Sequence, residues 1–190
     1  VLTERKYAQR LVPSSSSQMG NDYLMPNILF LCTGNAARSV IATVMMRSER
    51  PEYSIRGAGT FSIPGLPMSQ RTRAALAKFN LSDPDHKSHQ LEEQDCEWAD
   101  LIIIFEREHQ EYISRHHTNS LSIVSSLPRI SKELEKTSES FDIRIEKLNL
   151  IEKKFEQWEE VIDPAGGDQN IFDSCAREIN SLIHELALRL

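Results

Sequence analysis

The chain has 190 residues, of which 28 are acidic and 22 basic, and a formal net charge of −6. This acidic balance gives little support to a nucleic-acid partner, and no apolar run reaches the ~20 residues that a membrane-spanning helix needs, so we expect no membrane association. The cysteines Cys32, Cys96 and Cys175 lie far apart, without a C-x-x-C pair. We therefore expect a reducing, cytoplasmic setting rather than a disulfide framework.

The length fits one domain of ordinary size preceded by a tail. Residues 1–25 contain Pro13 and a run of serines at 14–17. This composition is typical of a linker, and we interpret the segment as a flexible N-terminal extension or an expression remnant. Residues 26–190 are predicted to form a single domain that opens with an apolar strand at 27–31.

After that strand, helical and extended patterns alternate along the sequence. Apolar residues recur at helical spacing over residues 40–50, and Pro51 ends that helix. A short strand is expected at 53–58, and Ser69 is predicted to cap the following helix. The packing face of this helix is predicted to comprise Ala74, Ala75, Leu76 and Phe79.

The pattern continues through the second half of the domain. A short helix is expected at 91–100, and the continuous apolar run at 101–105 predicts a strand that is covered on both faces. A helix to about His117 and a fourth strand at 121–124 follow. Strands that alternate with helices predict an α/β fold, a four-stranded parallel sheet with helices on both faces.

Residues 131–160 are highly charged, yet their apolar residues recur at helical spacing, which predicts a helix with one apolar stripe. We interpret this segment as a charged helical insertion packed on the domain, and a lid or a partner-docking helix is the alternative. The stripe comprises Phe141, Ile145, Leu148, Phe155 and Trp158.

The segment CTGNAARS begins at Cys32 and directly follows the first strand. The residues between the thiol and Arg38 provide enough backbone to wrap N–H groups around one tetrahedral anion, and the planar guanidinium can hold two of its oxygens. The helix that begins near Ser39 directs its positive end at the anion and favours a thiolate. The segment therefore predicts a phosphoryl-transfer site. Its phosphate-binding residues are predicted to be Thr33, Gly34, Asn35, Ala36, Ala37, Arg38 and Ser39.

Such a reaction needs a carboxylic acid opposite the thiolate to protonate the leaving group. Asp163 precedes Pro164 and a Gly-Gly pair, and the proline ring restricts and aims the carboxyl. Asp83 precedes Pro84 in the same way, so the dipeptide alone leaves both aspartates as candidates. The histidines show no metal-ligand spacing, and because the loop supplies its own positive field, no metal or other cofactor is expected.

Five segments, in this order, resemble the low-molecular-weight protein tyrosine phosphatase family, which also contains thiol-dependent arsenate reductases. They are the CTGNAARS loop, RGAGT at 56–60, DHKSHQL at 85–91, ADLIIIFE at 99–106 and VIDPAGG at 161–167. The resemblance implies that Cys32 is the nucleophile, Arg38 the phosphate clamp and Asp163 the general acid. Asp83 is then a turn residue.

The resemblance also implies supporting roles and a substrate class. Ser39 would hydrogen-bond the thiolate, Asn35 would hold a strained loop conformation, and His86 would be the partner of Asn35. The implied partners are a phosphorylated protein or a small aryl phosphate, together with oxyanions such as phosphate and arsenate. The implied reaction is hydrolysis of phosphotyrosine-like monoesters through a cysteinyl-phosphate intermediate.

Some positions depart from the eukaryotic members of the family. Ala165-Gly166 stands where a tyrosine pair usually follows Asp-Pro, and the usual aromatic wall falls near Ile63, with Phe61 as a substitute wall or a core residue. A less aromatic pocket stacks a phenyl ring less well. The alternative function is an arsenate reductase that uses an external low-molecular-weight thiol, because an internal disulfide relay needs a nearby cysteine pair and Cys96 stands alone.

Overall fold

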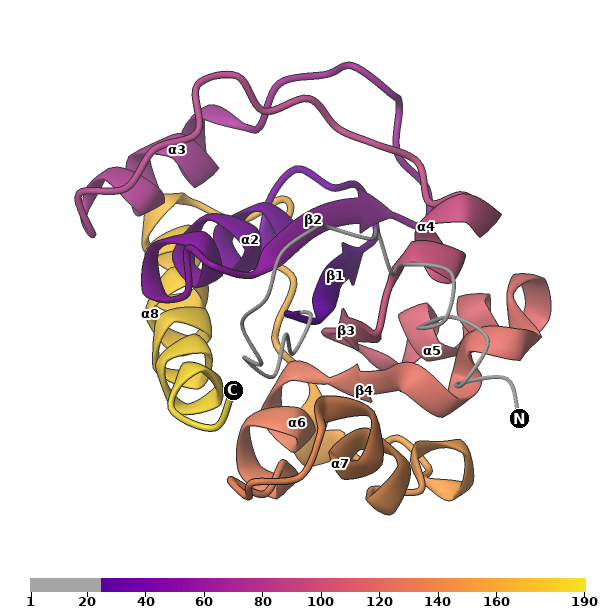
Figure 1. Cartoon of the computed structure of the whole chain (residues 1–190). Helices are drawn as coiled ribbons and strands as arrows, with labels where there is room; N and C mark the ends of the chain where they lie inside the picture. Colours follow the sequence, from indigo (N-terminus) through magenta and orange to yellow (C-terminus); the bar gives the residue numbers. More distant parts are fainter. Residues whose placement is uncertain (1–24) are drawn as a thin grey trace, which may run out of the picture.

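A four-stranded, fully parallel sheet forms the centre of the molecule (Figure 1). The computed structural model describes residues 25–190, so all but the last residue of the predicted N-terminal extension lies outside the described part. The strands run in the order β2-β1-β3-β4, which confirms the predicted α/β fold. Their bounds are β1 Asn27–Cys32, β2 Ser54–Gly59, β3 Leu101–Ile104 and β4 Val124–Ser126.

Helices connect the strands and cover both faces of the sheet, with α2 and α8 on one side and α5 on the other (Figure 1). Within residues 25–190, no helix combines the length and the apolarity needed to cross a membrane. The α-helices are α2 Arg38–Glu49, α3 Gln70–Ala77, α4 Glu93–Trp98, α5 Arg107–His116, α6 Leu127–Glu133, α7 Phe141–Lys147 and α8 Gln169–Ala187. Short 3-10 helices are η1 Thr118–Ile123, η2 Leu150–Glu152 and η3 Gln157–Glu159.

The strand β1 is buried along its whole length because it lies between β2 and β3 and is covered on both faces. Its side chains alternate between two apolar clusters. Ile28 and Phe30 belong to the cluster that includes residues of α2 and α8. Leu29 and Leu31 belong to the cluster that includes residues of α4 and α5. This double burial fixes the register of the strand and thereby the position of Cys32, its last residue.

The predicted start of α3 is confirmed, since the Ser69 hydroxyl accepts a hydrogen bond from Thr72 N–H at 3.0 Å. The predicted packing face is wrong at Ala74, which is exposed. The buried residues Thr72, Ala75 and Leu76 define the inward face, and Ala74 lies on the far side of the helix from them.

Two further elements differ from the sequence predictions. The fourth strand, β4, begins at Val124, later than predicted. Residues 121–123, which were predicted as strand, belong to the 3-10 helix η1. The single helix predicted within 131–160 is also wrong. The helix α7 ends at Lys147, and Asn149 has φ 49°, a left-handed conformation that terminates it. Of the remaining apolar residues, Phe155 is buried in the connection between η2 and η3, and Trp158, in η3, is 43% exposed.

Candidate active site

The loop of residues 33–37 joins the end of β1 to the beginning of α2. Two main-chain hydrogen bonds tie its first residues to the segment after β2. The N–H of Thr60 donates to the carbonyl of Cys32 at 2.9 Å, and the N–H of Phe61 donates to the carbonyl of Thr33 at 2.9 Å. The loop therefore lies at the carboxyl edge of the parallel sheet, where open α/β sheets bind ligands, and the positive end of α2 points into it.

The thiol of Cys32 is 3% exposed and lies 2.9 Å from the Ser39 hydroxyl. The Ser39 hydroxyl also accepts a hydrogen bond from Nδ2 of Asn35 at 2.9 Å. With one lone pair of Ser39 taken by Asn35, the hydroxyl hydrogen is available for donation to Sγ. A hydroxyl that donates to sulfur stabilises the thiolate, the form that acts as a nucleophile.

The conformation of the loop depends on Asn35, which is fully buried and has φ 48°. Nε2 of His86 donates to the carbonyl of Asn35 at 2.9 Å, and the N–H of His89 donates to its Oδ1 at 2.9 Å. The carbonyl can only accept, so Nε2 of His86 carries the proton. The predicted contact between His86 and Asn35 is present, and the second support, from the main chain of His89, was not predicted.

The guanidinium of Arg38 is 1% exposed and is held by a carboxylate that the sequence analysis missed. Its two terminal nitrogens donate to the two carboxylate oxygens of Glu106 at 2.7 and 3.0 Å. One of these nitrogens also donates to the carbonyl of Val161 at 3.2 Å. Glu106 lies two residues after the end of β3, at the same sheet edge as Cys32, and this position is the signal that would have indicated it.

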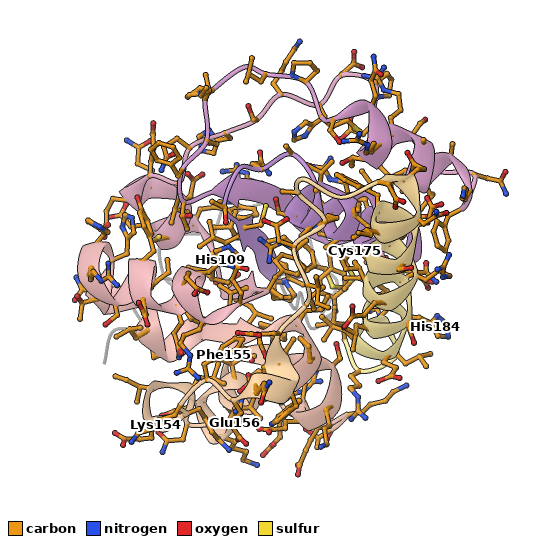
Figure 2. All side chains as sticks on the ribbon, turned by 180° about the vertical axis from the view of Figure 1, so that it is seen from behind. His109, Lys154, Phe155, Glu156, Cys175 and His184 are labelled. Carbon is orange, nitrogen blue, oxygen red and sulfur yellow. The ribbon has the colours of Figure 1, made fainter. Side chains whose placement is uncertain are left out.

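Glu106 is in turn surrounded by donors. Nε2 of the buried His109 lies 2.9 Å from Oε1 of Glu106, and the hydroxyl of Thr33 donates to the same oxygen at 3.2 Å. The N–H of Phe105 donates to Nδ1 of His109 at 3.3 Å, which leaves Nε2 as the protonated nitrogen of a neutral imidazole. Figure 2 shows His109 with its side chain in the interior of the molecule.

Burial and hydrogen bonding set the charges of these groups. Burial of His109 lowers its pKa despite the neighbouring Glu106 carboxylate. Burial opposes ionisation of Glu106, but the hydrogen bonds from His109 and Arg38 outweigh it and hold the pKa of this carboxyl well below its usual range. Burial also acts against the charge of Arg38, yet Glu106, Cys32 and Asp163 together raise its pKa. The site therefore presents a permanent cation beside a neutral imidazole.

Asp163 reaches this cation from the segment before α8. The N–H of Val161 donates to the carbonyl of Phe105 at 2.8 Å, which fastens the segment to the end of β3. Oδ2 of Asp163 then lies 3.0 Å from a terminal nitrogen of Arg38, and Oδ1 accepts from the N–H of Ala165 at 3.1 Å. Asp83, the other Asp-Pro aspartate, instead pairs with Arg47 at 3.5 Å.

Three exposed apolar residues lie on segments that carry or contact residues of the site. Phe61, whose N–H contacts the catalytic loop, is 85% exposed, so it is no core residue. Ile63 is 68% exposed, and Ile162, next to Asp163, is 73% exposed.

Cys175 is buried on α8 (Figure 2), and burial raises the pKa of its thiol to about 12. Among residues 25–190, no group of three or more His, Cys, Asp or Glu side chains is placed to hold a metal ion.

A comparison with models of known protein families shows to which family the chain belongs. The family "Low molecular weight phosphotyrosine protein phosphatase" matches residues 27–142, more than half of the chain. The chain belongs to the low molecular weight phosphotyrosine protein phosphatase family. The resemblance to this family is thus confirmed, and four of the five segments that carry it lie within the matched residues.

Individual relatives of this phosphatase-family chain carry two kinds of name. A "Protein-arginine-phosphatase" of Geobacillus stearothermophilus is 25% identical over 86% of this chain and 95% of its own length. A "Probable low molecular weight protein-tyrosine-phosphatase EpsP" of Ralstonia nicotianae is 29% identical over 53% of this chain and 70% of its own.

The fold is shared with solved structures of the family. The low molecular weight protein tyrosine phosphatase of T. tengcongensis superposes with a TM-score of 0.70, over 87% of this chain and 99% of that one, at 21% identity. The comparison therefore supports the four-stranded parallel sheet with a loop after β1.

Proposed function

We propose that this protein hydrolyses phosphate monoesters through a cysteinyl-phosphate at Cys32, without a metal. One observation carries the proposal. The buried guanidinium of Arg38 lies 3.0 Å from the Asp163 carboxylate and close enough to Cys32 for the thiolate charge to raise its pKa. Nucleophile, anion clamp and acid thus converge on one point at the end of β1.

The substrate phosphate would bind inside the catalytic loop. The loop N–H groups and the positive end of α2 face its equatorial oxygens, and Arg38 contributes charge-assisted hydrogen bonds. Glu106 holds the guanidinium in place from behind. Asp163 is ion-paired with the guanidinium at 3.0 Å, so binding of the phosphate is expected to exchange part of this ion pair for contacts with the substrate.

In the first step, the thiolate of Cys32 attacks phosphorus and the bond from phosphorus to the leaving oxygen breaks. Protonated Asp163 gives its proton to that oxygen, which leaves as a neutral hydroxyl compound. In the second step, the Asp163 carboxylate removes a proton from water, and the water oxygen attacks phosphorus. Inorganic phosphate and the Cys32 thiolate are released, and the hydroxyl of Ser39 stabilises the returning charge on sulfur.

The leading substrate class is a phosphotyrosine-like aryl monoester. Phe61 and Ile162 would form apolar walls beside the phosphate, since both are exposed and adjacent to residues of the site. An aromatic ring gains most from an aromatic wall, and Phe61 offers one despite the missing tyrosine pair. The partner of the enzyme would then be a phosphorylated protein or a small aryl phosphate.

Phosphoarginine is the second candidate. The relative named a protein-arginine-phosphatase matches 86% of this chain, whereas the tyrosine-phosphatase relative described above matches 53%. The leaving group of phosphoarginine is a guanidine, and the partly exposed Asp163 carboxylate is suited to bind and protonate it.

Arsenate reduction is not favoured, because these relatives are named as phosphatases. We further propose a cytoplasmic location, where reducing conditions preserve a thiolate.

Turnover of four substrates by the same preparation tests these proposals. They are p-nitrophenyl phosphate, a phosphotyrosine peptide, a phosphoarginine peptide, and arsenate with a small thiol. We expect phosphate release from the aryl substrates and no reduction of arsenate. Phosphate release from phosphoarginine alone would transfer the function to the second candidate, and arsenate reduction without phosphatase turnover would reject both.

A further inference from the structure

A cavity of about 420 Å³ lies behind the catalytic loop. Its walls come from one face of α2, from β2, and from the loop between α3 and α4, and Figure 1 shows α2 beside β2. Asn35 and His86 line this cavity, and both also fix the conformation of the catalytic loop. The volume is that of a site for a small molecule.

The cavity contains a buried polar group without a partner. Thr43, on α2, is 5% exposed, and its hydroxyl has no hydrogen-bond partner among the described residues. A Cβ atom at Gly57 would lie 3.0 Å from this hydroxyl and 3.0 Å from Nδ2 of Asn35. The glycine therefore leaves open the space between two polar groups. A buried hydroxyl without a protein partner is costly, and a water or a polar ligand that reaches it would remove that cost.

At the outer edge of β2, the main-chain groups of one residue next to this cavity have no hydrogen-bond partner among the described residues outside the sheet. The carbonyl of Ile55 accepts from the Arg47 side chain, and Gly59 exchanges main-chain hydrogen bonds with His89 and Leu91. Alternation along the strand directs the N–H and C=O of Gly57 to that same edge. No described residue outside the sheet hydrogen-bonds to either group. One donor and one acceptor of the main chain thus face the cavity.

Charges of both signs surround the opening. The cations are Arg47, Arg56 and Lys87. The carboxylates are Asp83, Asp85 and Asp95, the last of which pairs with His89. The pair of Arg47 and Asp83 lies 3.5 Å apart and is partly exposed, so it is weak enough to be exchanged for contacts with a ligand. A lining of both signs favours a ligand that carries both signs over a simple anion or cation.

We propose that this cavity binds a small zwitterion of the amino-acid type. Its carboxylate would lie against Lys87 and the hydroxyl of Thr43, and its ammonium against the carboxylates at the opening and the carbonyl of Gly57. Bound there, the ligand would contact Asn35 and so lie directly behind the catalytic loop. The proposal concerns binding and stands independently of the phosphatase reaction.

An NMR titration of the full chain tests the proposal without any phosphate substrate. The probe is L-glutamine, compared with N-acetyl-L-glutamine, which lacks the ammonium, and L-glutamine amide, which lacks the carboxylate. We expect saturable shifts of the Gly57 amide signal, with smaller changes at Gly34 on the far part of the catalytic loop. Each single-charge analogue should bind about tenfold more weakly, as expected for loss of one charged hydrogen bond.

Two variants locate the ligand. Thr43→Val removes the unpartnered hydroxyl, so its melting temperature should not fall, while affinity for glutamine should decrease several-fold. Lys87→Ala changes an exposed side chain, so it should leave stability unchanged and decrease the affinity for glutamine about tenfold. The matched control, Lys136→Ala, should bind as the wild type does. The proposal is wrong if glutamine causes no shift at Gly57, if the single-charge analogues bind equally well, or if both site variants retain full affinity.

Discussion

Arg38 donates from both terminal nitrogens to the two carboxylate oxygens of Glu106, at 2.7 and 3.0 Å, inside the fold. A paired fork of this kind fixes the plane of the guanidinium as well as its position. The guanidinium that we propose as the phosphate clamp is therefore oriented before a substrate arrives. Because Glu106 lies just after β3, between that strand and α5, this pair also connects the first turn of α2 to the segment after the neighbouring strand.

We expect Glu106→Gln to weaken the phosphatase by orienting Arg38 less well. An amide keeps the shape of the side chain but has one acceptor oxygen and no charge. Loss of a charge-assisted hydrogen bond should lower kcat/KM by roughly 10- to 100-fold. Steady-state kinetics with an aryl phosphate measures the effect. Glu111→Gln, which alters an exposed ion pair with Arg115 on the same helix, should retain wild-type kinetics, and unchanged kcat/KM in Glu106→Gln would remove the carboxylate from this role.

The buried His109 predicts how stability depends on pH. Burial lowers its pKa in the folded state, so between that value and the unfolded value of ~6.5 the unfolded chain binds more protons. The free energy of unfolding should therefore be fully retained above the unfolded pKa and should fall as the pH drops towards the folded pKa. Urea unfolding at several pH values between about 8 and about 5 measures this slope.

Replacement of the imidazole separates His109 from other titrating groups. His109→Gln keeps a donor for Glu106 and cannot gain the proton, so its stability should depend less on pH over the same interval. His116→Gln, at an exposed position on the same helix, should show the wild-type slope. An equal slope in the His109 variant would show that another group causes the pH dependence.

The sequence was sufficient for the residues that act through local spacing. Cys32, Arg38 and Ser39 flank one short loop, between the end of β1 and the first turn of α2, and this strand-turn-helix context follows from hydrophobic pattern and chain order. Glu106 and His109 act across strands, so their role depends on the register of β1 against β3, which one sequence does not specify. The helix prediction failed after Lys147 for another reason. The left-handed conformation of Asn149 ends the helix there, whereas apolar spacing alone had extended it.

The general acid is tested by the dependence on the leaving group. Asp163→Asn cannot donate a proton, so hydrolysis of aryl phosphates with basic leaving oxygens should slow by ~10²–10⁴-fold, and hydrolysis of those with good leaving groups much less. A series of substituted phenyl phosphates measures the slope of rate against leaving-group pKa. Asp83→Asn, which alters the aspartate that pairs with Arg47, should keep the wild-type slope. Uniform losses across the series would reject Asp163 as the acid.

Oxidation should inactivate the enzyme without an internal disulfide. Peroxide converts the Cys32 thiolate to a sulfenic acid. Cys96 belongs to the cluster on the other face of the sheet from Cys32, and the thiol of Cys175 has a pKa raised to about 12 by burial, so it is a poor attacking group. Mass spectrometry should find over-oxidised Cys32 or an adduct with a small thiol. A reducible crosslink from Cys32 to Cys96 or Cys175 would contradict this account.

Replacement of the nucleophile separates catalysis from anion binding. Cys32→Ser keeps the shape of the loop, but a serine hydroxyl is not ionised near neutral pH, so turnover should vanish while phosphate or vanadate still binds. Calorimetry with vanadate and an aryl phosphatase assay measure the two properties separately. Arg38→Lys should instead impair binding as well, because a point charge cannot form the paired contact.

Trapping of the covalent intermediate tests the central claim most directly. A variant such as Asp163→Asn, mixed with a substrate that has a good leaving group and quenched in acid within the first turnover, should accumulate phosphorylated Cys32, because the same aspartate is needed to activate water. Peptide mass spectrometry would then find the phosphoryl group on the CTGNAARS segment. Rapid turnover by the wild type with no phosphoryl group on Cys32 in either protein, at any quench time, would contradict the account.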